Sequence, residues 1–101
     1  MFKSTITLCG ETYTNVTATI NSYADLTTAL QLWIEGELLT VASTNLGAYD
    51  LWPSTGCIFV KNYSEGEGLA QQLEDQGIAT KTGLVVSWGN FGCTATEMRL
   101  N

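Results

Sequence analysis

The sequence contains no histidine, and this absence narrows the chemistry that the chain can perform. Histidine is the usual general base at neutral pH and a frequent ligand of zinc and iron. Nucleophile activation of the Ser-His-Asp or Cys-His kind is therefore excluded. The sequence also lacks a glycine-rich phosphate loop ending in GK[ST]. We therefore expect a protein that is not an enzyme, with no catalytic residue, no metal site and no cofactor.

Basic residues are scarce, whereas acids are not. The chain has four Lys and Arg residues against ten Asp and Glu residues, for a net charge of -6. Phosphate binding requires several basic side chains on one face, so we expect no direct contact with nucleic acid. A negative field repels nucleic acids and anionic membranes and attracts basic protein surfaces, although many acidic proteins are charged only for solubility. The four bases are Lys3, Lys61, Lys81 and Arg99.

The three cysteines, Cys9, Cys57 and Cys93, are widely spaced and include no CxxC pair. This spacing gives no support to a zinc ribbon or a thioredoxin-like redox site. The beginning of the sequence has no signal-peptide pattern, and no apolar run approaches the ~18 residues that span a membrane. These features predict a cytoplasmic protein with reduced thiols and no membrane contact.

The length of 101 residues and an apolar content of 45% predict a single α+β domain over residues 1–101. Residues 57–60 form an unbroken apolar run, which predicts a central strand covered on both faces. Period-two alternation and short apolar runs mark strand segments at residues 2–9, 13–21, 30–34, 37–43, 57–60, 83–88 and 93–100. Short connections favour a mostly antiparallel sheet of about six strands, with one helix packed on one face.

The helix is predicted at about residues 65–76. Ser64 is the candidate N-cap, and Glu67 completes a capping box with it. Gly77 is placed to end the helix in the left-handed conformation. Three apolar residues share the expected inner face, namely Leu69, Ala70 and Leu73.

The loop over residues 44–56 combines the only proline, Pro53, with the bulky side chains of Tyr49, Leu51 and Trp52. A loop rich in aromatic residues is a natural anchor for a protein partner. Trp52 has two interpretations, either as such an anchor or as a lid over the hydrophobic core. Trp33 and Trp88 are interpreted as core residues.

A series of short segments resembles a known family. The segments are Gly10-Glu11 with Tyr13, Ser22-Tyr23-Ala24, Ala29-Leu30-Gln31-Leu32, Gly36-Glu37-Leu38, Thr44-Asn45-Leu46 and Lys61-Asn62-Tyr63-Ser64-Glu65-Gly66-Glu67-Gly68, followed by a helix ending near Gly77-Ile78. In this order they resemble a family of small proteins of unknown function that phages, plasmids and conjugative elements carry in bacteria. The resemblance covers about three quarters of the chain and is most specific at the Lys-Asn-Tyr-Ser-Glu stretch.

Small proteins of such mobile elements are often inhibitors of host immunity, including anti-CRISPR proteins. The resemblance thus implies a phage or mobile-element inhibitor in the cytoplasm of the host bacterial cell. It would bind a host defence protein, a CRISPR-Cas effector, as a monomer or homodimer, and block the nucleic-acid site of that effector through an acidic surface. The residues expected at this surface are Glu65, Glu67, Glu74 and Asp75 on the helix, with Asp50 and Trp52 in the loop.

Two alternatives belong to another class of binding protein. The chain could sequester a small nucleotide signal, or it could pair with a toxin or a phage protein. A protein that sequesters anionic nucleotides needs a local cluster of Lys or Arg, which this sequence does not show.

Overall fold

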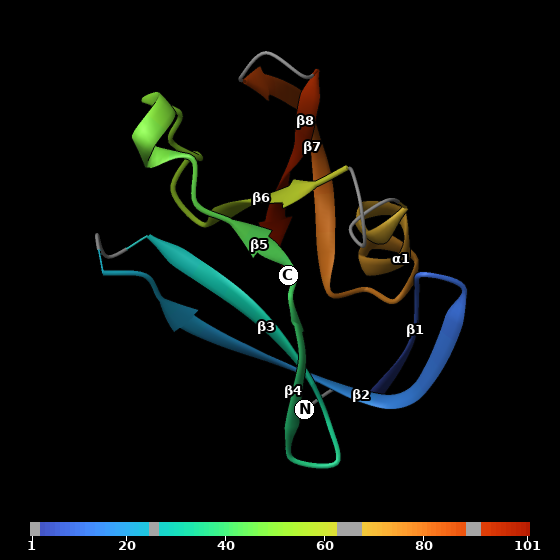
Figure 1. Ribbon diagram of the computed structural model, residues 1–101. Helices are drawn as coiled ribbons and strands as arrows, with labels where there is room; N and C mark the ends of the chain where they lie inside the picture. Colours follow the sequence, from blue (N-terminus) through green and yellow to red (C-terminus); the bar gives the residue numbers. More distant parts are fainter. Residues whose placement is uncertain (1–2, 25–26, 63–67, 89–91) are drawn as a thin grey trace.

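The computed structural model describes residues 3–24, 27–62, 68–88 and 92–101, and these form two antiparallel sheets of four strands each (Figure 1). Sheet A contains β1 (Lys3–Leu8), β2 (Glu11–Ser22), β3 (Thr28–Ile34) and β4 (Glu37–Val41) in the order β1-β2-β3-β4. Sheet B contains β5 (Ser43–Thr44), β6 (Cys57–Lys61), β7 (Ala79–Trp88) and β8 (Cys93–Leu100) in the order β5-β6-β8-β7. The predicted α+β class with antiparallel pairing is confirmed. The structure differs from the predicted sheet of about six strands in detail, because the described residues form eight strands that divide between two sheets.

Tight turns build the two hairpins of sheet A. Cys9 and Gly10, between β1 and β2, have φ angles of 50° and 80°. Glu35 and Gly36, between β3 and β4, have φ angles of 51° and 80°. Two successive residues with positive φ are typical of the type I′ turn, whose twist matches that of the flanking strands. These local signals make the two turns readable from the sequence, whereas the register shifts between Ser4 and Ile6 and between Leu32 and Trp33 are not announced by the turns.

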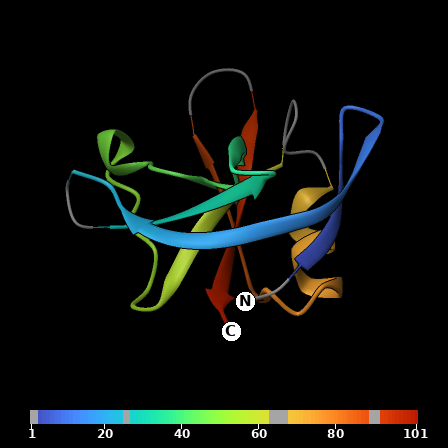
Figure 2. The ribbon, with the colours of Figure 1, turned by 90° about the horizontal axis from the view of Figure 1, so that it is seen from below.

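One stretch of backbone belongs to both sheets. β4 continues through Ala42 into β5, so the chain leaves sheet A and enters sheet B without a loop. At the crossing, the Ala42 amide donates to the Leu30 carbonyl (2.8 Å) and the Leu30 amide donates to the Ser43 hydroxyl (2.9 Å). The sheets cross at a steep angle, with β2 running across the direction of β8 (Figure 2). The predicted strand at 37–43 is therefore a bent strand at the corner between two sheets.

The main hydrophobic core lies between the two sheets and α1 (Leu69–Asp75). A smaller cluster, Leu46, Phe59 and Ala95, lies on the opposite face of sheet B. β6 serves both, since Ile58 and Val60 join the main core while Phe59 joins the smaller one. The prediction of a central strand covered on both faces is confirmed. The largest side chains of the main core are Ile6, Leu30, Leu32, Ile58, Leu69, Leu73 and Met98.

The helix starts later than the sequence predicts. Gly68 precedes it with a φ of 76°, a left-handed conformation that no α-helix continues through, so α1 begins at Leu69 instead of residue 65. The proposed capping box of Ser64 and Glu67 lies outside the described residues. The prediction for the other end is confirmed, because Gly77 has a φ of 74° and its amide donates to the Glu74 carbonyl (3.1 Å). Such a residue satisfies carbonyls that the last turn leaves open.

Helix α1 lies beside sheets A and B and contacts an outer strand of each, β1 and β7 (Figure 1). The amide side chain of Gln72 accepts from the backbone N–H of Thr7 (2.7 Å) and donates to its carbonyl (2.9 Å), as a neighbouring strand would. Glu74 accepts from the backbone N–H of Lys81 on β7 (2.9 Å). The helix therefore covers part of the backbone at one edge of each sheet, at Thr7 of β1 and at Lys81 of β7.

Strand β7 begins at Ala79, four residues before the predicted start. Its pairing with β8 shifts register between Lys81 and Val85, where Gly83 has a φ of 97°. The bulge places three residues of β7 opposite Glu97 alone. Gly83 lies within this bulge, although the sequence predicted that the strand begins at this residue.

Candidate functional site

The loop between β5 and β6 covers the outer face of sheet B and includes a turn of 3-10 helix, η1 (Gly47–Tyr49). Local hydrogen bonds define its shape, since the Tyr49 and Leu51 amides both donate to the Leu46 carbonyl (2.9 and 3.2 Å). The Leu46 side chain is buried against Phe59 beneath the loop. The loop therefore rests on a small apolar core that belongs to it.

Trp52 is held in one orientation although 53% of its surface is exposed. Its indole N–H donates to the carboxylate of Asp50 (3.2 Å), and Asp50 has a left-handed φ of 57°. Its ring lies over Gly47 so closely that a Cβ there would be 2.6 Å from the ring atom Cη2. A side chain at residue 47 would displace the ring. Trp52 is thus preorganised, and little of its conformational entropy remains to be lost on binding.

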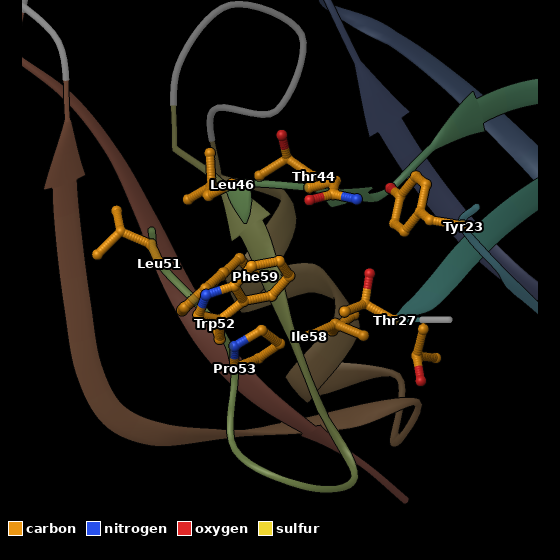
Figure 3. Close-up of a pocket in the computed structure, with 11 residues that line it drawn as sticks. Tyr23, Thr27, Thr44, Leu46, Leu51, Trp52, Pro53, Ile58 and Phe59 are labelled. Carbon is orange, nitrogen blue, oxygen red and sulfur yellow. The ribbon is translucent and has the colours of Figure 1, made fainter. Parts of the chain in front are cut away.

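Beneath Trp52 the loop encloses a very small hollow, which Figure 3 shows between Trp52, Pro53 and Phe59 on one side and Tyr23 and Thr27 on the other. Its volume of about 10 Å³ leaves room for about one water molecule. Both interpretations of Trp52 therefore fit the geometry, because one part of the ring closes the hollow and the other part faces solvent.

Tyr49 and Trp88 extend the exposed aromatic surface beyond Trp52. Their ring centroids lie 6.2 Å apart at an interplanar angle of 47°, within the range of favourable aromatic pairs. Tyr49 is 55% exposed, and Trp88 is half-buried against the smaller core. We use the name aromatic surface for Tyr49, Trp52 and Trp88 together with Asp50.

Glu97 fastens this loop to the sheet. The side chain, on β8, is only 4% exposed, and it accepts from the Ser54 amide (3.0 Å), the Ser54 hydroxyl (3.3 Å) and the Thr82 hydroxyl (2.8 Å). Ser54 belongs to the loop and Thr82 to the bulge of β7. The carboxylate of Glu97, on β8, therefore connects the loop between β5 and β6 with the edge strand β7.

Burial and hydrogen bonding act on Glu97 in opposite directions. Burial raises the pKa of its carboxyl, but the bonds from the Ser54 amide, the Thr82 hydroxyl and the Ser54 hydroxyl stabilise the charged form and leave the pKa below its usual value. Burial, followed by the negative charge of Glu97, raises the pKa of the Cys57 thiol, while Arg99 acts in the other direction. We therefore describe Glu97 as an ionised structural group, and Cys57 as a thiol in its neutral form.

The residues that the sequence suggested for an acidic surface do not come together. Asp50 and Trp52 are in contact in the loop, as described above. Glu74 is half-buried and bonds to the β7 backbone, whereas Asp75 is exposed and accepts from the side-chain Nε2 of Gln71 (2.9 Å). In both ribbon views α1 and η1 lie on opposite sides of the molecule (Figures 1 and 2). The other two acids, Glu65 and Glu67, lie outside the described residues.

Among the described residues, no three His, Cys, Asp or Glu side chains are grouped closely enough to hold a metal ion. The three cysteines are free thiols. Within the described ranges, no helix combines the length and the apolar character needed to cross a bilayer.

Sequence reasoning missed two residues on which the aromatic surface depends. Gly47 is one of ten glycines, and nothing in its neighbours indicates that an indole ring packs on it. Glu97 stands inside the strand pattern of residues 93–100, where an acid is usually solvated. The position of Glu97 opposite Phe59 could have indicated that it is buried. That position follows only from the pairing of β6 with β8, which the sequence pattern does not give.

Comparisons with known proteins leave the aromatic surface as the basis of the functional argument. No protein-family model matches this chain, and no curated protein and no solved structure matches it.

Proposed function

We propose that this protein is a non-catalytic inhibitor that binds a protein partner through the aromatic surface. The observation that carries the proposal is Trp52, a half-exposed indole that Asp50 and Gly47 hold in place. Tryptophan and tyrosine dominate the energetic centres of protein interfaces, and a preorganised ring loses little entropy on binding. An exposed group of aromatic residues on a rigid face is typical of an interaction site.

The partner that we propose is a CRISPR-Cas effector of the bacterial host, with its basic nucleic-acid groove as the binding site. The net charge of -6 supports this choice, because it favours encounter with a basic groove and repels the nucleic acid that competes for it. The resemblance of the sequence to small mobile-element proteins supports it independently. In this proposal Asp50 and Trp52 are central to the contact.

The acids of α1 take a different part in the proposal. Glu74 is engaged with the β7 backbone, so its first role is structural. Asp75 is exposed and contributes to the negative field at a distance from the aromatic surface. We therefore assign Asp75 to steering the encounter, Glu74 to holding the helix against β7, and Trp52 to the affinity of the complex.

Sequestration of a nucleotide gains no support from the hollow beneath Trp52 or from the three hollows lined by Ile20, by Asn15 and by Thr55. Neither Lys nor Arg is among the lining residues of these hollows. Recognition of a phosphate would require such side chains or a built nest of backbone amides. A toxin or phage protein could occupy the same aromatic surface, and the experiment below separates it from a Cas effector.

The proposal is tested with tagged wild-type protein and the variants Trp52→Ala and Leu38→Ala, used to capture partners from cells that express an active CRISPR-Cas system. Leu38 is the matched control, because it is 48% exposed on β4 and is not part of the aromatic surface. We expect the wild type and Leu38→Ala to recover a stoichiometric Cas effector. Loss of an interfacial tryptophan should weaken binding of the purified effector by about 2 kcal/mol, roughly 30-fold.

A titration with salt and a charge-reversal variant of Asp75 complete the test. Asp75→Lys should slow association and reduce its dependence on salt, with little change in dissociation. Equal binding by wild type and Trp52→Ala would show that the aromatic surface is not the contact. Recovery of a toxin or a phage protein instead of an effector would replace the proposed partner.

A further inference from the structure

In the part of the chain that the structure describes, no strand pairs with the outer edge of sheet B along the second half of β7. β7 is the last strand of this sheet, with β8 on its inner side. Glu74 covers the backbone of Lys81, near the beginning of the strand. Leu84, the last residue of the bulge, is 46% exposed, and Val85, directly after the bulge, is 56% exposed. The remainder of the strand thus presents apolar side chains beside an uncovered edge, an arrangement that favours pairing with another strand.

The register identifies which backbone groups point outward. The Asn62 amide donates to the Thr94 carbonyl (2.9 Å), so the backbone groups of Thr94 face β6. Ser87 is paired with Thr94, and its backbone groups therefore point away from β8. Orientation alternates along a strand, so the backbone groups of Val85 also point outward. Val85 and Ser87 are two consecutive attachment points for a further strand.

We propose that this edge binds a second copy of the same chain, with β7 pairing antiparallel to β7 of the partner. A two-fold axis at Val86 places Val85 opposite Ser87 of the partner subunit, and Ser87 opposite the partner's Val85. Each of these two pairs can exchange two hydrogen bonds, because outward-facing residues meet as hydrogen-bonded pairs. The result is one continuous sheet in which both copies of sheet B take part.

The local sequence of β7 allows a second copy to approach this edge without apposing like charges. The chain carries ten acids and a net charge of -6, so two copies repel each other least where acids are absent from the contact. Residues 79–88 contain no acid, and Lys81 is their only ionic side chain. A basic strand would find no carboxylate on β7, whereas pairing about Val86 places the exposed Val85 beside Ser87 of the partner subunit and the exposed Leu84 beside the partner's Trp88.

The pairing would combine the two aromatic surfaces. The rise of ~3.3 Å per residue places the two copies of Trp88 about 13 Å apart along the strand direction. A two-fold axis perpendicular to the sheet leaves the same face of both copies on one side. The dimer therefore presents two aromatic surfaces side by side, which would raise avidity for a partner with a repeated or symmetric site. The inference does not depend on the identity of that partner.

The test measures molar mass by light scattering across the micromolar range for the wild type, Val85→Pro and Val85→Thr. Proline lacks the outward N–H and is tolerated at such an edge position, whereas threonine keeps both the N–H and the strand preference. We expect the wild type and Val85→Thr to shift with concentration from 10.9 kDa to twice that mass, and Val85→Pro to stay at 10.9 kDa. A wild type that stays at 10.9 kDa throughout, or a Val85→Pro variant that dimerises equally well, overturns the proposal.

Hydrogen exchange of the wild type keeps the proposal testable if Val85→Pro does not fold. The amides of Val85 and Ser87 should exchange more slowly as protein concentration rises, while the exchange of the Leu38 amide stays unchanged. Exchange at Val85 and Ser87 that is independent of concentration would refute self-pairing. Protection that appears only when a different protein is added would show that a foreign strand occupies this edge.

Discussion

Replacement of Glu97 tests whether one carboxylate holds the aromatic loop on sheet B. Glu97→Ala removes the acceptor of three hydrogen bonds, from the Ser54 amide, the Ser54 hydroxyl and the Thr82 hydroxyl. Bonds to a charged acceptor contribute about 1.5–3 kcal/mol each when fully buried, but Ser54 and Thr82 are exposed enough for water to replace part of this, so we use ~1 kcal/mol for each. The expected loss of unfolding free energy is therefore about 3 kcal/mol, which lowers Tm by roughly 10–20 °C in a domain of this size.

Glu97→Gln separates the shape of the group from its charge. Glutamine keeps an oxygen that can accept from Ser54, and its amide can donate to the Thr82 hydroxyl. Only the charge assistance is lost, so about 1.5 kcal/mol of stability should disappear. Urea unfolding of the wild type and both variants measures these differences. Glu37→Gln, an exposed acid on β4, is the control and should change stability by less than ~0.5 kcal/mol.

The dependence on pH gives a second measure of the same interaction. Hydrogen bonding leaves the pKa of folded Glu97 below that of the unfolded chain, which is about 4.3. The stabilisation is therefore fully present above pH ~4.3 and is lost as the pH falls through the lower pKa of the folded state. The difference in stability between wild type and Glu97→Gln should shrink across that acidic window. A constant difference, or equal losses in the alanine and glutamine variants, would refute the assignment of an ionised carboxylate that fastens the loop.

Two further substitutions test the helix. Leu73→Asp should unfold the domain, because Leu73 is completely buried under α1 and an unpaired charge there has no partner; a cooperative thermal melt of the variant would contradict this. Gln72→Ala should lower stability by about 1 kcal/mol and accelerate exchange of the Thr7 amide, since the side chain of Gln72 bonds to both backbone groups of Thr7. Unchanged exchange at Thr7 would show that the helix does not cover the edge of β1, and Gln71→Ala serves as the comparison on the exposed face.

The sequence could predict those parts of the fold that depend on local signals. The Glu35-Gly36 turn, the alternation of β2 and the glycine that ends α1 each depend on a few neighbouring residues. The predicted start of the helix was wrong. The capping-box pattern at Ser64 is also a local signal, but Gly68 has a left-handed conformation and the helix begins only after it, at Leu69. Patterns of this kind identify an element better than its first residue.

The division into two sheets could not be read in the same way. It depends on β4 continuing past Ala42 into a different sheet, and on β6 pairing with β8 across more than thirty residues of sequence. Alternation specifies which side of a strand is apolar, but it does not specify which sheet the strand joins. The candidate site shows the same limit, since Trp52 was recognised from its loop whereas Gly47 and Glu97 acquire their roles only through contacts distant in sequence or specific to the fold.

The passage of the chain through Ala42 has a consequence for the alignment of the two sheets. Since β4 and β5 are continuous, a slip of one residue in the pairing of β3 with β4 would also move Ser43 and Thr44 by one place against β6. Such a slip turns inward-facing residues outward, and here it would do so on both sides of the crossing at once. The main core of sheet A and the small core beneath the aromatic loop thus specify a single shared register, so that an error in either sheet is opposed by the packing of both.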